Sequence, residues 1–284
     1  MTTTSATTSP VFAAQGTGVT FVGVLRSEWI KLTSLRSTVW CYAIIVAINL
    51  GLALLAAATI QLQGDQTPTL DQGFWVRSAT VGIIFSQLVI AVLGALVITG
   101  EYGTGMIRST LTVVPKRLPA LLAKSVVFGL STFAVSLVSI IGSALVAAPI
   151  LAGKGFTLDL ADGLAWGALI GGAGYLSLVG LIALFLGTIV RNSAAGISAA
   201  LGLIFVAPII LQIFAAVTQA AWAQNVLEFL PSTAGGTLYR YVAGPVPTIN
   251  DVVVLDAGQG LLVLLAWVVL FGAVASVLLK RRDA

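Results

Sequence analysis

The chain has 284 residues, of which 58% are hydrophobic and 8% are charged, and its mean hydropathy is +1.06. A typical soluble domain has roughly 45–50% apolar and about 25% charged residues, so a soluble fold of this size could not bury so much apolar surface. The absence of histidine and the single cysteine, Cys41, exclude an internal disulfide, a Cys/His zinc site and catalysis by a Ser-His-Asp triad.

Residues 1–18 are polar, small and uncharged, and we expect them to form a disordered tail rather than a signal peptide, because no basic segment precedes an apolar run. The next segment, 21–37, reads FVGVLRSEWIKLTSLRS. Its apolar residues recur at helical spacing, which predicts an amphipathic helix lying in the membrane plane.

Phe21, Leu32 and Leu35 belong to the apolar arc of this interfacial helix, and Trp29 lies at its edge. Glu28 points into the same arc, so we expect it to pair with Lys31 or to contact another part of the protein. A helix that only anchors the first span is an equally good reading. The residues of interest on this helix are Leu25, Glu28, Trp29, Lys31 and Leu32.

Six long apolar runs follow, each of 20 to 27 residues and each free of Asp, Glu, Lys and Arg. At 1.5 Å per residue, even the shortest run spans roughly 30 Å as a helix, enough to cross the hydrocarbon core. The sequence therefore predicts an all-α integral membrane protein with one transmembrane domain, residues 19–284. The predicted spans are 39–60, 79–99, 125–151, 164–190, 194–217 and 260–279.

The basic residues predict the orientation of the six spans. With the N-terminus inside, eleven of the fourteen Lys and Arg residues lie in inner segments, so the positive-inside rule places both termini in the cytoplasm. The net charge of +4 thus has an explanation in topology, and we expect no nucleic-acid partner. The inner residues are Arg26, Lys31, Arg36, Arg108, Lys116, Arg117, Lys124, Arg191, Lys280, Arg281 and Arg282, and the outer ones are Arg77, Lys154 and Arg240.

Two connections have predictable features. Only residues 191–193 separate the fourth and fifth spans, which predicts a tight hairpin at the inner surface. The last outer segment, 218–259, begins with an apolar stretch too short to span. We expect a short helix there that stops near Pro231, and a second short helix around 236–242.

The inner connection 100–124 reads GEYGTGMIRSTLTVVPKRLPALLAK. Glu101 opens it, Gly103 and Gly105 allow a free turn, and residues 106–114 are long enough for a short helix that stops at Pro115. Such a helix could transmit motion from a cytoplasmic partner. An ordinary basic loop that only obeys the charge rule is the alternative.

A few polar residues interrupt the spans: Asn49, Ser86, Gln87 and Gln212, together with Pro208. A buried amide in lipid needs a partner, so each marks an interhelical hydrogen bond or a polar pathway. The chain contains no G-x-x-x-x-G-K-[ST] sequence and no carboxylate within a span. Nucleotide binding by a P-loop and ion coupling through buried acids therefore lack their usual groups.

The order of four segments around the six spans resembles the ABC-2 type transporter permeases, of the split kind common in actinobacteria. The segments are LRSEWIKLTSLRSTVW, ITGEYGTGMIRSTLTVVPKR, LEFLPSTAGGTLYRY and the C-terminal KRRDA. The resemblance implies the membrane subunit of an ATP-driven exporter in the bacterial plasma membrane. It implies a pair of permease copies, expected to be a homodimer, and two separate ATP-binding subunits that hold ATP and magnesium, so that this chain is not an enzyme and has no cofactor.

The resemblance also assigns roles to segments. The interfacial helix would be the connecting helix, and the short outer helices around 222–241 would be re-entrant helices at the exit. The ATPase-coupling residues would be Glu101, Tyr102, Gly105, Met106, Ile107, Arg108 and Leu111. The pathway would run between two copies, and its candidate residues are Asn49, Phe85, Ser86, Gln87, Phe205 and Gln212.

The charge-free spans favour an apolar or amphipathic cargo. Two other readings stay open. The chain could be a membrane anchor or assembly protein that transports nothing, in which case the inner connection is passive. An intramembrane enzyme is disfavoured, because histidine is absent and no span contains an acid.

Overall fold

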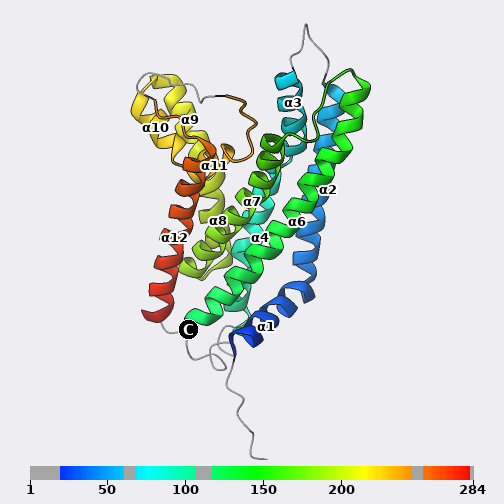
Figure 1. Ribbon diagram of the computed structural model, residues 1–284. Helices are drawn as coiled ribbons and strands as arrows, with labels where there is room; N and C mark the ends of the chain where they lie inside the picture. Colours follow the sequence, from blue (N-terminus) through cyan, green and yellow to red (C-terminus); the bar gives the residue numbers. More distant parts are fainter. Residues whose placement is uncertain (1–19, 61–67, 107–116, 245–251, 282–284) are drawn as a thin grey trace, which may run out of the picture.

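The computed structural model describes residues 20–60, 68–106, 117–244 and 252–281, which form a bundle of tilted helices (Figure 1). Helix α1 and the last turn of α12 lie at one end of the bundle, and α10 lies at the other. The elements are α1 (Phe21–Ser34), α2 (Arg36–Thr59), α3 (Pro68–Thr80), α4 (Ile83–Gly103), α6 (Arg117–Gly153), α7 (Gly163–Val190), α8 (Ser193–Leu201), the π-helical η1 (Gly202–Val206), α9 (Ala207–Thr218), α10 (Ala221–Glu228), α11 (Pro231–Gly236) and α12 (Ala257–Arg281).

Within the described residues, six helical segments are long and apolar enough to cross a membrane, which confirms the predicted number of spans. Several of them extend beyond the predicted apolar runs. The second runs from Asp71 to Gly103 and the third from Arg117 to Gly153, so Glu101 and Lys124 belong to helices rather than to a loop. A helix has no reason to stop at the edge of the hydrocarbon region, because its backbone hydrogen bonds are equally useful among the headgroups.

The N-terminal helix is shorter than predicted and turns sharply into the first span. Thr20 caps α1 by accepting a hydrogen bond from the backbone N–H of Gly23, and Leu35 is extended between α1 and α2. Helix α1 buries Val24, Glu28 and Leu32 and half-buries Leu25, so the middle of the predicted apolar arc packs against the bundle. Phe21, the first residue of the helix, and Leu35, which follows its last residue, are exposed.

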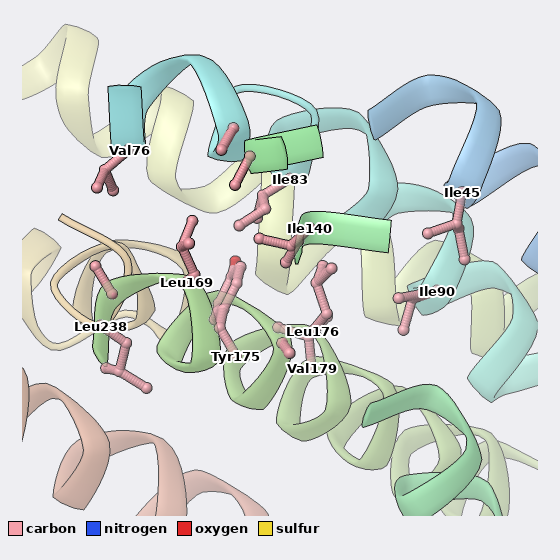
Figure 2. Close-up of a cluster of buried hydrophobic side chains, with 14 of the residues drawn as sticks. Ile45, Val76, Ile83, Ile90, Ile140, Leu169, Tyr175, Leu176, Val179 and Leu238 are labelled. Atoms are coloured by element: carbon pink, nitrogen blue, oxygen red, sulfur yellow. The ribbon is translucent and has the colours of Figure 1, made fainter. Parts of the chain in front are cut away.

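The core lies around α7, which packs against α4, α6, α8 and α12. Figure 2 shows aliphatic side chains from several helices around Tyr175 of α7, among them Ile83, Ile140 and Leu176. Glycine permits the closest approach: a Cβ on Gly94 of α4 would lie 2.5 Å from the carbonyl oxygen of Gly180. Small residues of this kind let helix backbones meet in lipid, where little hydrophobic force drives helices together.

The hairpin between α7 and α8 is as tight as predicted. Arg191 ends α7 in the left-handed conformation, with φ of 59°, and the Asn192 side chain accepts a hydrogen bond from the N–H of Ala195 to begin α8. The fifth span then widens into η1, where the N–H of Ala207 bonds to the carbonyl of Gly202. This wide turn directly precedes Pro208, whose ring would otherwise clash with a carbonyl of the preceding turn.

The two short outer helices are α10 and α11, and Trp267 of α12 donates a hydrogen bond to the carbonyl of Phe229 between them. The prediction for α11 is wrong in position, because it begins at Pro231 and ends at Gly236 instead of starting there. Proline suits the first turn of a helix, where its fixed φ is helical and its missing N–H has no partner to lose. Pro231 therefore starts a helix, whereas the sequence pattern predicts only the end of one.

Candidate functional site

Four charged side chains meet where α1, the last turn of α4 and the second turn of α6 come together. The Nζ of Lys124 lies 2.5 Å from Oε2 of Glu28 and 2.9 Å from Oε1 of Glu101. The Nζ of Lys31 lies 2.8 Å from Oε1 of Glu28 and 3.2 Å from Oε1 of Glu101. We call these four residues the ion cluster. Its formal charges sum to zero.

Three members of the ion cluster are almost fully buried. The side chains of Glu28, Glu101 and Lys124 are 3%, 5% and 7% exposed, whereas that of Lys31 is 24% exposed. A charge is costly to bury unless opposite charges and hydrogen bonds replace its water, and here each ammonium contacts two carboxylates. The cluster is therefore a fixed junction of three helices.

The pKa values of the α1 residues follow from this arrangement. Burial by itself would raise the pKa of Glu28, but the nearby ammonium groups of Lys124 and Lys31 outweigh burial and hold it below its ordinary value. Burial by itself would lower the pKa of Lys31, but Glu28 and Glu101 outweigh it and raise that pKa. Both groups are thus held in their charged forms.

Local sequence explains how each side chain reaches the cluster. Val24, Glu28 and Leu32 are four residues apart, so all three lie on the buried face of α1. Glu101 lies in the last turn of α4, which ends at Gly103, and Gly105 follows with a φ of +72°. That left-handed conformation favours glycine, so Gly105 forms a turn directly after α4.

A cavity of about 260 Å³ adjoins the ion cluster between α1, α4 and α6. Its walls combine cluster residues with aliphatic and aromatic side chains, including Leu35, Leu96, Val97 and Phe128. The second carboxylate oxygen of Glu101 is buried and accepts no hydrogen bond from the described residues. The ends of α1 and α4 are therefore incompletely packed against each other at this point.

A second polar network ties the neighbouring helix ends together. The guanidinium of Arg191 lies 5.3 Å from the ring centre of Tyr102, a cation–π contact between the α7–α8 hairpin and α4. Arg191 and Arg117 also donate hydrogen bonds, at 3.5 and 3.0 Å, to the carbonyls of Leu278 and Leu279 in the last turn of α12. Cations at a helix C-terminus are favoured by the helix dipole.

The structure brings together part of the predicted coupling segment. Glu101 and Tyr102 contact the two networks, Gly105 forms the turn, and Met106 follows it with its side chain exposed. The remaining candidates, Ile107, Arg108 and Leu111, lie outside the described residues, and so does most of the helix predicted for 106–114.

The interfacial helix divides between two surroundings. Leu32 is buried and Leu25 half-buried, Glu28 and Lys31 enter the ion cluster, and Trp29 is exposed. The alternatives expected for Glu28 are both confirmed, since it pairs with Lys31 and also contacts α6 through Lys124.

Lys124 is not among the candidates that the sequence suggests, because it reads there as the end of a basic loop. A signal for it is nevertheless present. The surrounding residues, LPALLAKSVVF, are otherwise apolar or small, so a lysine there needs a buried acid. Glu28, the acid out of place in an apolar arc, is the partner that such a lysine requires.

The candidate pathway residues fall into two groups. Asn49, Ser86 and Gln87 are buried inside the bundle. Gln87 of α4 accepts a hydrogen bond from the Tyr175 hydroxyl of α7, and the amide of Asn49 donates to the carbonyl of Ile45 in its own helix, at 3.0 Å. For Gln87 the interhelical bond is therefore the reading that the structure supports.

The other three candidates lie on the surface of the chain. Phe85 of α4 and Phe205 of η1 are 51% and 39% exposed, and the amide side chain of Gln212 on α9 is also exposed. Helix α8 packs on α4 and α7, but beyond η1 the span packs mainly against α10. The outer half of the fifth span thus leaves the bundle with a polar side chain on its surface.

A family model described as "ABC-2 family transporter protein" matches residues 24–208, which include the ion cluster and most of the fifth span. No curated protein sequence matches the chain.

Proposed function

The chain belongs to the family of ABC-2 transporter proteins, and we propose that it is the permease subunit of an ATP-driven exporter in a bacterial plasma membrane. In this proposal a separate ATP-binding subunit holds ATP and magnesium. It acts on the permease through the segment that follows α4. This chain contributes the membrane path and no catalytic residue.

The observation that carries the proposal is the junction at the end of α4. A force on the segment after Gly103 would act on Glu101, and the carboxylate of Glu101 contacts lysines of two other helices. A passive loop has no need of a buried, charge-balanced junction at its base, because buried ion pairs contribute little net stability compared with apolar packing. A loop that transmits movement does need one.

Charge supports the cytoplasmic assignment of this end. Of the eleven described basic residues, eight lie at the end that carries α1 and the α7–α8 hairpin, and three at the opposite end (Figure 1). The eight are Arg26, Lys31, Arg36, Arg117, Lys124, Arg191, Lys280 and Arg281, and the three are Arg77, Lys154 and Arg240. By the positive-inside rule, this distribution supports the proposal that the ion cluster faces the cytoplasm, where ATP is available.

We further propose that the pathway forms between two copies of the chain, along the face that includes Phe85, Phe205 and Gln212. In lipid the exposed amide of Gln212 would lack hydrogen-bond partners, and a second copy supplies them. Asn49, Ser86 and Gln87 are buried within one copy, so a cargo would reach them only if the helices separated.

Reconstitution tests the function. The chain should bind no ATP alone, should co-purify with a P-loop protein, and should export cargo only when that protein and ATP are present. Transport by the isolated chain down an ion gradient would contradict the proposal.

Replacing residues 103–111 with a flexible linker distinguishes an exporter subunit from an anchor or assembly protein. The exporter reading expects both export and cargo-stimulated ATP hydrolysis to fall at least tenfold. Unchanged rates would favour the anchor. A silent substitution elsewhere in a loop, such as replacement of the exposed Ala161, serves as the control.

A further inference from the structure

The ion cluster ties α1 to two helices through two separable pairs. Glu28 and Lys124 connect α1 to α6, and Lys31 and Glu101 connect α1 to the last turn of α4. The two pairs are joined by the contacts of Lys31 with Glu28 and of Lys124 with Glu101. Each pair is charge-neutral, so either can be removed without leaving a net charge behind.

The two connections differ in what surrounds them. The backbone of α1 packs along α6 and, to a lesser extent, against the start of α2, whereas α4 is not among its main packing partners. The cavity of about 260 Å³ lies between α1 and α4, and it is lined by Leu32 and Leu35 as well as by Leu96 and Val97. The α1–α6 contact thus combines apolar packing with a buried pair, while the α1–α4 contact depends much more on Lys31 and Glu101.

From this asymmetry we propose that Lys31 and Glu101 are a positioning pair that makes α1 follow the end of α4, with the Glu28–Lys124 contact on α6 as the pivot. The cavity gives α1 room to move. Because Leu35 joins α1 directly to α2, movement of α1 reaches the first span. The inference deepens the proposed function, since it extends the path of a signal arriving after α4 to a second helix and on to α2.

Two matched double substitutions separate this link from the general stability of the cluster. Lys31→Met with Glu101→Gln removes the α1–α4 pair and leaves Glu28 with Lys124. Glu28→Gln with Lys124→Met removes the α1–α6 pair and leaves Lys31 with Glu101. Each variant loses one positive and one negative charge from the same site, so the two differ in which helices remain connected.

The readout is the environment of an α1 residue. With Cys41 changed to Ser, an environment-sensitive fluorophore on Ser27→Cys, which is exposed on α1, reports on that helix. A second protein with the label on Thr104→Cys, exposed just after α4, reports on the incoming signal. Both are measured in the complete complex with its ATP-binding subunit, before and after the nucleotide is trapped with vanadate.

In the otherwise unchanged complex, both labels should respond to trapping. The Lys31→Met/Glu101→Gln variant should keep the response at residue 104 and lose at least about four-fifths of the response at residue 27. The Glu28→Gln/Lys124→Met variant should retain most of the response at residue 27. The conservative Lys31→Arg should also retain it, because an arginine reaches the same carboxylate.

Two outcomes overturn the link. One is an α1 response that survives in Lys31→Met/Glu101→Gln, and the other is an equal loss in both double variants, which would show only that the cluster supports folding. If the Lys31→Met/Glu101→Gln variant fails to fold, Glu101→Asp is used in its place, because it keeps the charge and shortens the side chain. An undiminished response at residue 27 in Glu101→Asp would then contradict the link. No response at residue 104 in the unchanged complex would instead contradict the proposed function.

Discussion

Lys124 occupies the most demanding position of any residue in the ion cluster, because it neutralises two carboxylates from two other helices while almost fully buried. Among the described residues, Lys31 is the other cation that contacts Glu28 and Glu101. At the scale of single residues, each charge in the cluster is thus balanced by the charges of the other members. Its contribution is best seen by removing one member at a time.

Lys124→Met should destabilise the protein by about 3–5 kcal/mol, because it leaves two buried carboxylates to share one ammonium. Thermal denaturation in detergent measures the effect. The matched control is Lys280→Met on the exposed end of α12, expected to change stability by less than about 0.5 kcal/mol. Adding Glu28→Gln to Lys124→Met should recover part of the loss. Equal stability of the Lys124 and Lys280 variants would contradict the buried cluster.

The docking of α1 should depend on pH only at the extremes. The lowered pKa of Glu28 gives a stabilisation that is present above its ordinary value of 4.5 and lost as the pH falls through the lowered value. The raised pKa of Lys31 gives one that is present below 10.5 and lost as the pH rises through the raised value. Fluorescence of a label on Ser27→Cys should therefore stay constant between these limits. A transition within that window would contradict the assignment.

At the scale of elements, close contacts decide how the spans pack. Helices α4 and α7 meet where Gly94 faces Gly180, and no side chain separates the two backbones. Helix α1 instead rests on α6 through side chains and meets α4 across a cavity. The bundle therefore combines a rigid centre around α7 with an α1 that is held mainly from one side.

Gly94→Ala should destabilise the bundle by about 1–3 kcal/mol, because its Cβ would lie 2.5 Å from a backbone oxygen that cannot move independently. Gly100→Ala in the same helix is the matched control, since a Cβ there meets nothing within 4 Å. Alanine favours the helix over glycine, so this control should be neutral or stabilising by up to about 1 kcal/mol. Denaturation midpoints that fall equally for both variants would contradict the close contact.

At the scale of the whole molecule, one end of the bundle is strongly basic, and the positive-inside rule predicts that this end faces the cytoplasm. Cysteines introduced at Asp159 and Lys116, after replacement of Cys41, should react with an impermeant reagent from outside and from inside respectively. Labelling in intact cells and in inverted vesicles measures this. Reaction of both positions from the same side would contradict the six-span topology.

Much of this molecule follows from composition along the chain. Runs of 20 or more residues without a charge have only one stable form in lipid, so the pattern of apolar runs is enough to predict the number of spans. The tight hairpin at Arg191 follows in the same way, because three residues leave no other connection. The start of α11 does not, since a proline can end one helix or begin another, and the neighbouring fold decides which.

The sequence by itself determined that the protein is membrane-embedded, how many times it crosses, and which end carries the positive charge, because each depends on the local cost of placing a residue in lipid or water. Only the tertiary structure decided that Glu28, Lys31, Glu101 and Lys124 form one site, and that Gln87 bonds within the bundle while Gln212 faces outwards. These facts depend on the rotation and depth of each helix relative to its neighbours. Packing sets that relation, and no single stretch of sequence contains it.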